Sequence, residues 1–455
     1  MNQPETEMVN VVIAKADTFL HTYNEILTKL GGIENFVSKN DKIFIKINLN
    51  TPEGFPVNTS FDLIKSLIKS CKKAGASGIS LGSYSSKGVI IRNIDNLLKI
   101  NEFVNPLGAQ LLFLDEDSGS ELLDILQNYD KFIVVNQVNV DPLFDCTLSF
   151  MNSSKINIKN SQDLMEADFD SEFYLKEIIS KLINVFEKRK PDLIINDLFY
   201  VMEGAGPYIY NDSNLIKTQL MVGGTDPVAV DLITLKLLGI DPVKNPLITA
   251  ARERNLGITD LNNITIVGED LESSKVNINY CEKNLEDITI HNCSVKTGSN
   301  CSGCYHIAYH LLNIMKTYMT KDLKYIAGQS VLIGKNPSEP DSKKNVILFG
   351  NCAIKSTKNS SFRTVITSKE IIPITNKIKS IFGKEKPNKK LKTIEKSNKQ
   401  VLNLPGCPPN LYSSIKMISN YYGKQEIPNL YLYQNLIETY TSTNNKKRTR
   451  EVFKE

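Results

Sequence analysis

The sequence lacks the charge excess and the long apolar segments that mark several protein classes. Its 455 residues carry a formal net charge of only +4. A general nucleic-acid binder usually has a stronger basic bias, so nucleic acid is not an expected partner. No apolar run is long enough to span a bilayer, and the first residues lack the basic-then-apolar order of a secretory signal. We therefore expect a cytoplasmic protein without a membrane partner.

Three catalytic signatures are also missing from the sequence. It contains no Walker motif, no complete GxGxxG and no convincing serine–histidine–acid pattern. Nucleotide hydrolysis and nucleophilic catalysis are therefore poor expectations, and the function has to be sought in other residues.

Strand-like and helix-like segments alternate along the first half of the chain. The apolar spacing of Leu63, Ile64, Leu67 and Ile68 predicts a helix that ends at Gly75. A turn is expected at Gly223–Gly224, followed by a helix. The strand-like runs cover residues 9–16, 41–50, 77–84, 110–117, 131–138 and 192–199. This alternation predicts an α/β fold with a mostly parallel sheet, whose active groups lie past the carboxyl ends of the strands.

The chain is too long for one ordinary hydrophobic core, so two domains are expected. We place the first at residues 1–278 and the second, a smaller cysteine-rich α/β domain, at residues 279–455. A mostly basic stretch at residues 384–400 is interpreted as a solvated loop rather than a binding patch.

Four of the eight cysteines stand where a predicted element meets a loop. They are Cys301 and Cys304 in CSGC, Cys352 in FGNCA and Cys407 in PGCPP. Cytoplasmic thiols stay reduced, so ligands or buried side chains are expected rather than disulfides. Thiolates on separate loops at one end of a sheet can converge, and four of them suit an iron–sulfur cluster or a zinc ion.

Zinc has a second possible ligand set, because His306 and His310 follow the cysteine pair. They are four residues apart on a predicted helix, so they share a face and would make a Cys2His2 site with CSGC. The alternative makes both histidines ordinary residues of a helix surface. Among the other cysteines, Cys71 is interpreted as a core residue, and Cys293 as a spare ligand that is not used.

The order of these motifs carries a resemblance. CxxC, then a strand ending in GxCA, then PGCPPN before a helix resembles the cluster-binding domain of the nickel–iron hydrogenase small subunit. The complex I subunit with the terminal cluster shares much of it. Over roughly the last third of the chain, the resemblance implies a flavodoxin-like fold with one [4Fe–4S] cluster. It further implies that the ligands are Cys301, Cys304, Cys352 and Cys407.

Candidate site residues in the first half are polar groups at predicted strand ends. Lys46 and Asn48 occupy alternate positions and would together hold an anionic substrate or phosphate, unless Lys46 is a surface lysine. Glu203 precedes Gly204 and Gly206 in MEGAGP. This stretch is interpreted as an anion nest with Glu203 as a base, or as a structural loop that needs a positive φ.

Two aspartates in GTDPVAVD complete this set. Asp226 precedes Pro227, which suits the N-cap of a helix, and this structural role is favoured over substrate binding. Asp231 lies one turn further on and would point to the same site or to solvent.

The segments of residues 9–270 resemble the family called domain of unknown function 362, most specifically at MEGAGP and GTDPVAVD. Members often carry iron–sulfur ligands near the C-terminus, which agrees with the cysteine pattern. This chain departs from the family in the middle of the domain. Asn139 and Asp141 stand where a lysine and a histidine are expected, and Met151 precedes Asn152. Any chemistry that those basic residues perform in relatives would be altered here.

These observations favour a redox protein with one [4Fe–4S] cluster and an unspecified electron donor or acceptor. One alternative is a non-redox enzyme that acts on a small anionic substrate through Lys46 and Glu203, with a structural cluster. The other is a zinc-stabilised scaffold.

Overall fold

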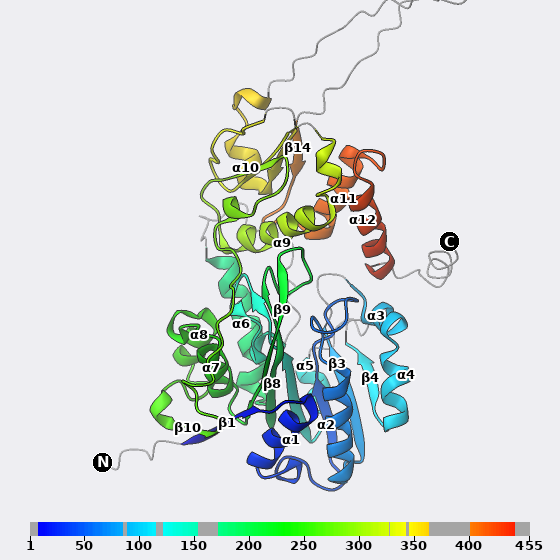
Figure 1. Cartoon of the computed structure of the whole chain (residues 1–455), viewed down its shortest axis with the longest axis vertical. Helices are drawn as coiled ribbons and strands as arrows, with labels where there is room; N and C mark the ends of the chain where they lie inside the picture. Colours follow the sequence, from blue (N-terminus) through cyan, green and yellow to red (C-terminus); the bar gives the residue numbers. More distant parts are fainter. Residues whose placement is uncertain are drawn as a thin grey trace, which may run out of the picture.

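The computed structural model describes residues 8–84, 89–114, 122–152, 172–326, 328–342, 345–363 and 401–441. Strands and helices alternate along these residues, and the strands form two separate sheets (Figure 1). The α/β class predicted from the sequence is confirmed. The basic stretch at 384–400 lies outside the described residues.

The larger sheet has eight strands. They are β1 (Val9–Lys15), β2 (Lys42–Lys46), β3 (Gly78–Ser83), β4 (Gln110–Phe113), β5 (Lys131–Gln137), β8 (Leu193–Gly204), β9 (Ser213–Gly224) and β10 (Ile264–Gly268). Their order is β10-β1-β9-β8-β5-β2-β3-β4. All neighbours are parallel except β9, which runs antiparallel to both β1 and β8. A short ribbon of β6 (Val140–Asp141) and β7 (Asp145–Cys146) lies outside this sheet.

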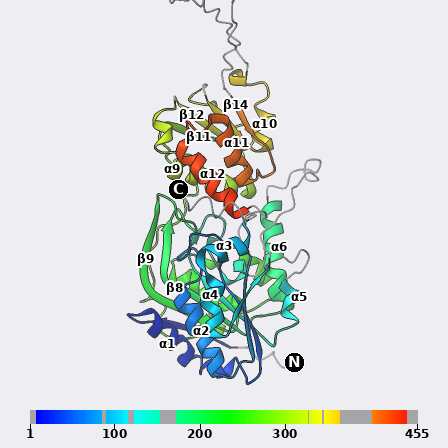
Figure 2. The ribbon, with the colours of Figure 1, turned by 90° about the vertical axis from the view of Figure 1, so that its right-hand side faces the viewer.

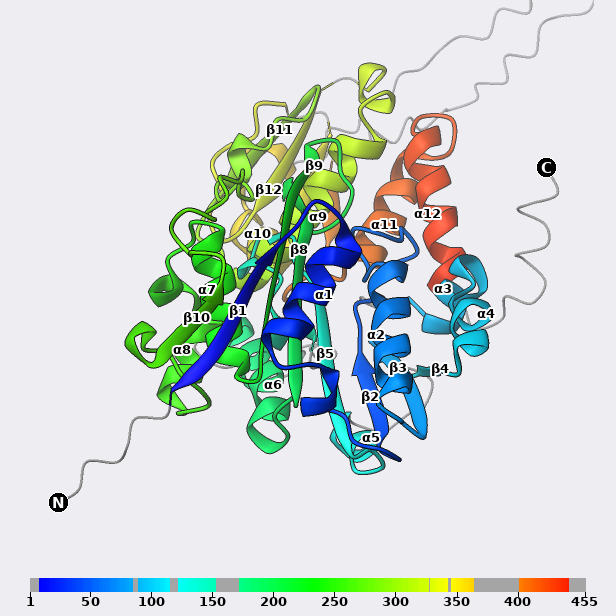
Figure 3. The same ribbon diagram turned by 60° about the horizontal axis from the view of Figure 1, so that its bottom comes forward.

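Helices cover both faces of the larger sheet (Figure 3). One face packs against α1 (Phe19–Lys29), α2 (Phe61–Lys73), α3 (Ile91–Leu98) and α4 (Ile100–Val104). The other packs against α5 (Leu122–Leu126), α6 (Phe173–Lys188), α7 (Pro227–Leu237) and α8 (Pro246–Glu253). Helix α2 confirms the predicted spacing, because its buried side chains include Leu63, Leu67 and Cys71. Cys71 is therefore a core residue.

The prediction of a turn at Gly223–Gly224 was wrong, because both residues belong to β9. A Cβ atom on Gly223 would lie 2.9 Å from Ile26 Cγ2, and one on Gly224 would lie 2.9 Å from Val230 Cγ2. The two glycines therefore allow α1 and α7 to pack closely on the strand. The β8–β9 hairpin is long, and its tip extends past the sheet toward α9 (Ser302–Tyr318) (Figure 1).

The smaller sheet has four parallel strands in chain order. They are β11 (Cys293–Thr297), β12 (Gln329–Ile333), β13 (Val346–Phe349) and β14 (Val401–Leu404). The flavodoxin order expected by resemblance places the second strand outside the first, and the four described strands do not show that exchange. The associated helices are α9, α10 (Gly350–Ser356), α11 (Leu411–Tyr422) and α12 (Pro428–Thr441).

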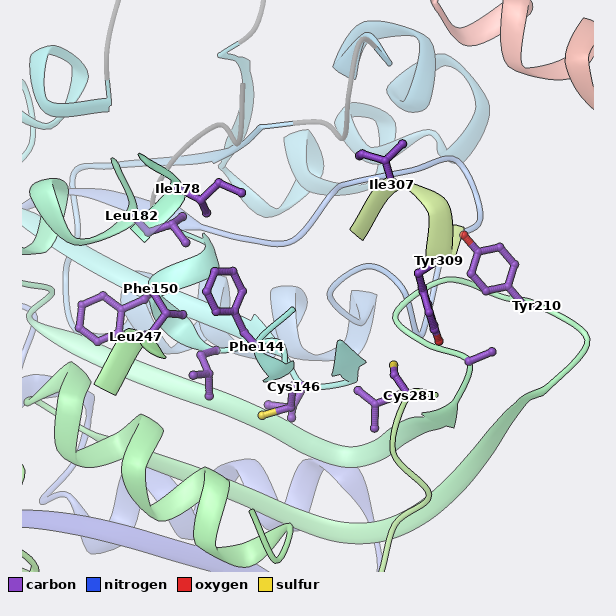
Figure 4. Close-up of a cluster of buried hydrophobic side chains, with 14 of the residues drawn as sticks. Phe144, Cys146, Phe150, Ile178, Leu182, Tyr210, Leu247, Cys281, Ile307 and Tyr309 are labelled. Carbon is purple, nitrogen blue, oxygen red and sulfur yellow. The ribbon is translucent and has the colours of Figure 1, made fainter. Parts of the chain in front are cut away.

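Helix α9 connects the two parts of the molecule. Its buried side chains occupy almost every position from Gly303 to Met315, and they join the core cluster that also contains α6 residues. Figure 4 shows part of this cluster, from Phe150 to Tyr309 beside Cys281. Helix α12 makes a second connection, because Asn93 Nδ2 of α3 donates a hydrogen bond to Tyr440 O at 2.9 Å (Figure 2). None of the described helices has the length and hydropathy that crossing a membrane requires.

Candidate functional site

The four candidate cysteines all lie near the carboxyl end of the smaller sheet. Cys301 follows β11 and is the N-cap residue of α9, and Cys304 lies in the first turn of that helix. Cys352 follows β13 and lies in the first turn of α10. Cys407 follows β14 and precedes α11. Parallel strands therefore deliver thiols from three different connections to one edge, as expected from the sequence.

Hydrogen bonds join the two turns that carry Cys352 and Cys407. Asn351 N donates to Gly406 O at 3.0 Å, and Gly406 N donates to Asn351 Oδ1 at 3.0 Å. Gly350 has a φ of +89°, and a Cβ at this position would lie 3.4 Å from Cys304 Sγ. The absence of that side chain leaves room beside the sulfur, and it permits the left-handed backbone that turns β13 into α10.

The thiols influence one another electrostatically. A hydrogen bond with Cys304 lowers the pKa of Cys301 to about 6. The same bond and burial raise the pKa of Cys304, and the nearby thiols of Cys407 and Cys352 add to the increase. Burial raises the pKa of Cys352, which Lys355 and Lys335 oppose. The four sulfurs therefore form one electrostatic group, of which Cys301 and Cys304 are buried and the other two are half-buried.

Thiols are the donors of iron–sulfur clusters and also of many zinc sites. In the part of the chain that the structure describes, no three His, Cys, Asp or Glu side chains are arranged to hold a metal ion. A tetrahedral zinc ion needs all its ligand atoms about 2.3 Å from one point. A [4Fe–4S] cluster is larger, and each of its four thiolate ligands binds a different iron. The described side chains therefore offer no preformed site for a single zinc ion.

The two histidines of α9 are buried, so the prediction of helix-surface residues was wrong. His306 Nδ1 lies 3.1 Å from the hydroxyl of Tyr174, which comes from α6. His310 Nδ1 lies 3.0 Å from the hydroxyl of Tyr210, at the tip of the β8–β9 hairpin. The periodicity of α9 did not reveal this burial, because the helix is covered on several sides by elements distant in sequence. Each imidazole thus has a tyrosine partner.

The remaining cysteines are separate from this group. Cys293 begins β11, at the opposite end of the strand from Cys301, and accepts a hydrogen bond from Gln329 Nε2 at 3.7 Å. Cys146 and Cys281 are buried. Burial raises the pKa of Cys281 and of Cys293 to about 12, which keeps both as neutral thiols.

Lys46 lies inside the larger part of the molecule, so the surface-lysine alternative was wrong. Its side chain is 2% exposed, and Nζ donates to Asn152 Oδ1 at 2.8 Å and to Ile47 O at 3.2 Å. Burial lowers the pKa of Lys46 to about 7. Asn48 is also buried, but its Oδ1 accepts a hydrogen bond from Gln137 N at 2.8 Å. The two residues therefore contact different partners, rather than forming one pair.

The MEGAGP segment forms the base of a tight hairpin tip. Glu203 accepts hydrogen bonds from Asn279 N at 2.7 Å and from Asn279 Nδ2 at 2.8 Å. Gly204 has a φ of +77°, as the structural-loop interpretation expects, and a Cβ there would lie 2.3 Å from Asp212 O. A Cβ on Gly206 would lie 2.7 Å from Val140. Both oxygens of Glu203 thus hold the chain that leads toward the smaller sheet, and its role as a base stays a prediction.

The two aspartates of GTDPVAVD have structural partners. Asp226 is the N-cap of α7, and its Oδ1 accepts a hydrogen bond from Ala229 N at 2.9 Å, which confirms the predicted cap. Asp231 is fully buried and does not point to solvent. It accepts hydrogen bonds from Ser149 N and Oγ and from Asn196 Nδ2. Burial raises its pKa to about 6.

The two residues that depart from the family pattern form hydrogen bonds with backbone groups. Asn139 Nδ2 donates to Pro56 O at 2.7 Å, and its Oδ1 accepts from Met202 N at 2.8 Å. Asp141 Oδ1 accepts from Leu143 N and Phe144 N, both at 2.8 Å. Asn152, in contrast, binds Lys46 directly.

One further pair of residues escaped the sequence analysis. Gln137 and Asp197 are opposite each other in the β5–β8 register and are buried. Gln137 Oε1 and Asp197 Oδ2 have no hydrogen-bond partner among the described residues. Burial raises the pKa of Asp197 to about 7. Asp197 interrupts a mostly apolar strand, so the sequence did contain a signal of this pair.

Comparison with known proteins bears on the larger sheet. Residues 43–236 match the family described as "Domain of unknown function (DUF362)". The resemblance of the N-terminal region is therefore confirmed, and the matched region contains Lys46, Glu203, Asp226 and Asp231. The DUF362 match does not extend to the four cysteines. No curated protein and no solved structure matches the chain.

Proposed function

We propose that Cys301, Cys304, Cys352 and Cys407 bind one [4Fe–4S] cluster and that the protein transfers electrons. The observation that carries the proposal is the grouping of these thiols at one edge of the smaller sheet, within electrostatic range of one another. When bound, such a cluster accepts and releases one electron, at a potential set by burial and by hydrogen bonds to its sulfurs.

The polypeptide contributes rigidity and partial exclusion of water at this edge. Cys301 and Cys304 are fixed on the first turn of a long buried helix. A Cβ on Gly303 would lie 2.8 Å from the ring of Tyr174, so glycine lets this ring pack against the CSGC turn. Cys352 and Cys407 are half-buried, and are thus less buried than Cys301 and Cys304. An electron partner would approach the cluster from their side.

The experiment is a determination of iron, acid-labile sulfide and zinc, with a visible spectrum, on the full chain purified without oxygen. We expect about four irons and four sulfides per chain and broad visible absorbance. Cys407→Ala is expected to abolish all three signals. Cys293→Ala is the matched control, because it removes a thiol at the other end of β11, and it is expected to keep the cluster.

Two results would overturn the proposal. One zinc per chain without sulfide would move the assignment to a zinc-stabilised scaffold. A full cluster that survives Cys407→Ala would show that other ligands hold it.

A second candidate function rests on a different observation. The buried Lys46 amine has carbonyl partners and no described carboxylate partner, and a lysine with a lowered pKa is suited to proton abstraction or to covalent chemistry with a carbonyl. A non-redox enzyme with a structural cluster would use such a group. A cluster whose visible spectrum does not change when dithionite is added would favour this candidate over electron transfer.

A further inference from the structure

A tyrosine of the larger part of the molecule lies directly against the CSGC turn. Tyr174 belongs to the first turn of α6 and is buried. If Gly303 carried a Cβ, that atom would lie 2.8 Å from both Cγ and Cδ2 of the Tyr174 ring. Such a distance is too short for two carbon atoms that are not bonded. The ring therefore occupies the space that a side chain at position 303 would need.

A second contact holds the same tyrosine at its hydroxyl. This hydroxyl lies 3.1 Å from His306 Nδ1, and the centroids of the two rings are 6.1 Å apart. Gly303 and His306 are three residues apart on α9, so they lie on one face of that helix. Tyr174 is thus attached to the beginning of α9 at two points, through its ring and through its hydroxyl.

The two buried thiols lie beside these contacts. Cys301 and Cys304 flank the turn on which the ring packs, and both belong to the same core cluster as Tyr174. Burial raises the pKa of Tyr174, and the thiol of Cys301, the carboxyl of Asp141 and the thiol of Cys304 add to the increase. The ring therefore covers the cysteine pair from the side of the larger sheet.

We propose that Tyr174 is a positioning residue that keeps water away from Cys301 and Cys304 and thereby sets the reduction potential of the cluster proposed above. When a donor adds one electron to a cluster, its negative charge increases. Water near the sulfurs stabilises that charge and raises the potential, whereas a ring in place of water lowers it. Because α6 packs on the larger sheet, the same ring couples that part of the molecule to the redox centre.

A second tyrosine–histidine pair on α9 provides the matched control. The hydroxyl of Tyr210 lies 3.0 Å from His310 Nδ1, and the centroids of these rings are 6.2 Å apart. Tyr210 is buried like Tyr174. Its partner His310 follows Cys304 by six residues, or about 9 Å along the helix. Removal of the Tyr210 ring therefore creates a similar defect in the core, at a greater distance from the thiols.

The first measurement needs no cluster. The full chain is freed of metal with EDTA and bipyridyl without oxygen, and its thiols are alkylated with iodoacetamide, which reacts with exposed thiolates. Cys301 and Cys304 share one tryptic peptide, residues 297–316, so mass spectrometry separates them from the other thiols. Tyr174→Leu is expected to accelerate alkylation of this peptide severalfold. Tyr174→Phe keeps the ring and Tyr210→Leu keeps the shield, so both are expected to react like the unmodified chain.

The second measurement rests on the proposed function. The chain with its cluster is titrated with dithionite, and the potential is read from the visible spectrum after iron and sulfide have been determined for each variant. Tyr174→Leu is expected to have a higher potential than the unmodified chain, whereas Tyr174→Phe and Tyr210→Leu are expected to retain its value. A chain without a cluster would overturn the proposed function and the effect on potential, but the alkylation rates would still decide whether Tyr174 shields the thiols.

A variant on the other side of the contact protects the test against misfolding. Gly303→Ala adds the Cβ that the ring excludes, in a helix that tolerates alanine well, and it is expected to displace the ring and to accelerate alkylation in the same way. It replaces Tyr174→Leu if that variant does not fold. Unchanged alkylation in Tyr174→Leu, equal acceleration in Tyr210→Leu, or a potential that does not rise in Tyr174→Leu would each overturn the proposal.

Discussion

The carboxyl ends of the two sheets are built on the same plan and filled with opposite chemistry. At the larger sheet, the residues after the strands are amides, carboxylates and a lysine, and hydrogen bonds tie many of them to loops. At the smaller sheet, the corresponding positions carry four thiols. The first edge is largely satisfied by the polypeptide itself, and the second has donor atoms suited to a bound group.

This difference indicates which of the two edges is suited to a bound group. Polar groups that are buried with partners stabilise a site that is already formed, whereas grouped thiols are the ligand type that iron–sulfur clusters and zinc ions use. The first edge is not entirely satisfied, because Lys46 and Asp197 are buried ionisable groups that form no ion pair within the described part of the chain. Predictions on these two residues, and on one residue with an ordinary structural role, test the comparison.

The largest expected effect concerns the buried amine of Lys46. Burial lowers its pKa to about 7 from an ordinary value of 10.5. Between these values the unfolded chain binds one proton more than the folded chain. The free energy of unfolding therefore rises with pH by about 1.4 kcal/mol per pH unit from this group, and that stability is lost as pH falls. Lys46→Met is expected to remove this slope in urea denaturation between about pH 8 and pH 10.

The matched control for this experiment is Lys244→Met, which removes a lysine whose side chain is 84% exposed. Its pH dependence is expected to equal that of the unmodified chain. An unchanged slope in Lys46→Met would mean that the amine stays charged and hydrated, and the contrast between the two edges would weaken.

A smaller effect is expected at Asp197. Burial raises its pKa to about 7 from an ordinary value of 3.8, so the folded chain retains a proton that the unfolded chain releases. Stability from this group is therefore full below the lower value and falls as pH rises to about 7. Asp197→Asn stays uncharged and is expected to be more stable by up to about 4 kcal/mol near pH 8, with little change near pH 4.

Denaturant titrations at several pH values provide the measurement for Asp197→Asn. Asp17→Asn, at an exposed position, is the control and is expected to leave the pH profile unchanged. A loss of stability in Asp197→Asn at high pH would show that the carboxylate is charged and has a partner.

The smallest effect is expected at Asp226, which caps α7 and also accepts a hydrogen bond from Ile258 N at 3.3 Å. Asp226→Ala removes the N-cap of α7 and is expected to lower the free energy of unfolding by about 1 kcal/mol. Asp226→Asn keeps an oxygen acceptor and is expected to lose only a few tenths of that amount. Equal losses in the two variants, measured by urea denaturation, would show that the negative charge matters rather than the cap.

Much of the fold was predictable because it follows local patterns. The apolar runs predicted the strands β1, β2, β3, β5 and β8, and the spacing of apolar residues predicted helix α2. The antiparallel strand β9 was not predicted, because a pair of glycines in the sequence is typical of a turn. In the structure, these glycines allow Ile26 and Val230, which belong to helices distant in sequence, to pack closely on the strand.

The candidate site divides in the same way. Motif order was sufficient to select the four cysteines, and chain order in a parallel sheet brought them to one edge. The burial of Lys46 and His310 was not predictable, because it depends on Asn152 and Tyr210, which are about a hundred residues away.

The position of β1 has a consequence for how the protein is made. Its neighbours in the sheet are β9 and β10, and Val11 is paired with Gly224 and Ile266, more than two hundred residues later. During synthesis this strand leaves the ribosome early with both edges unpaired, and it stays so until most of the larger sheet exists. Such distant pairing slows folding and exposes strand edges. We expect this sheet to close late, with the earliest-made strand inserted between two of the last.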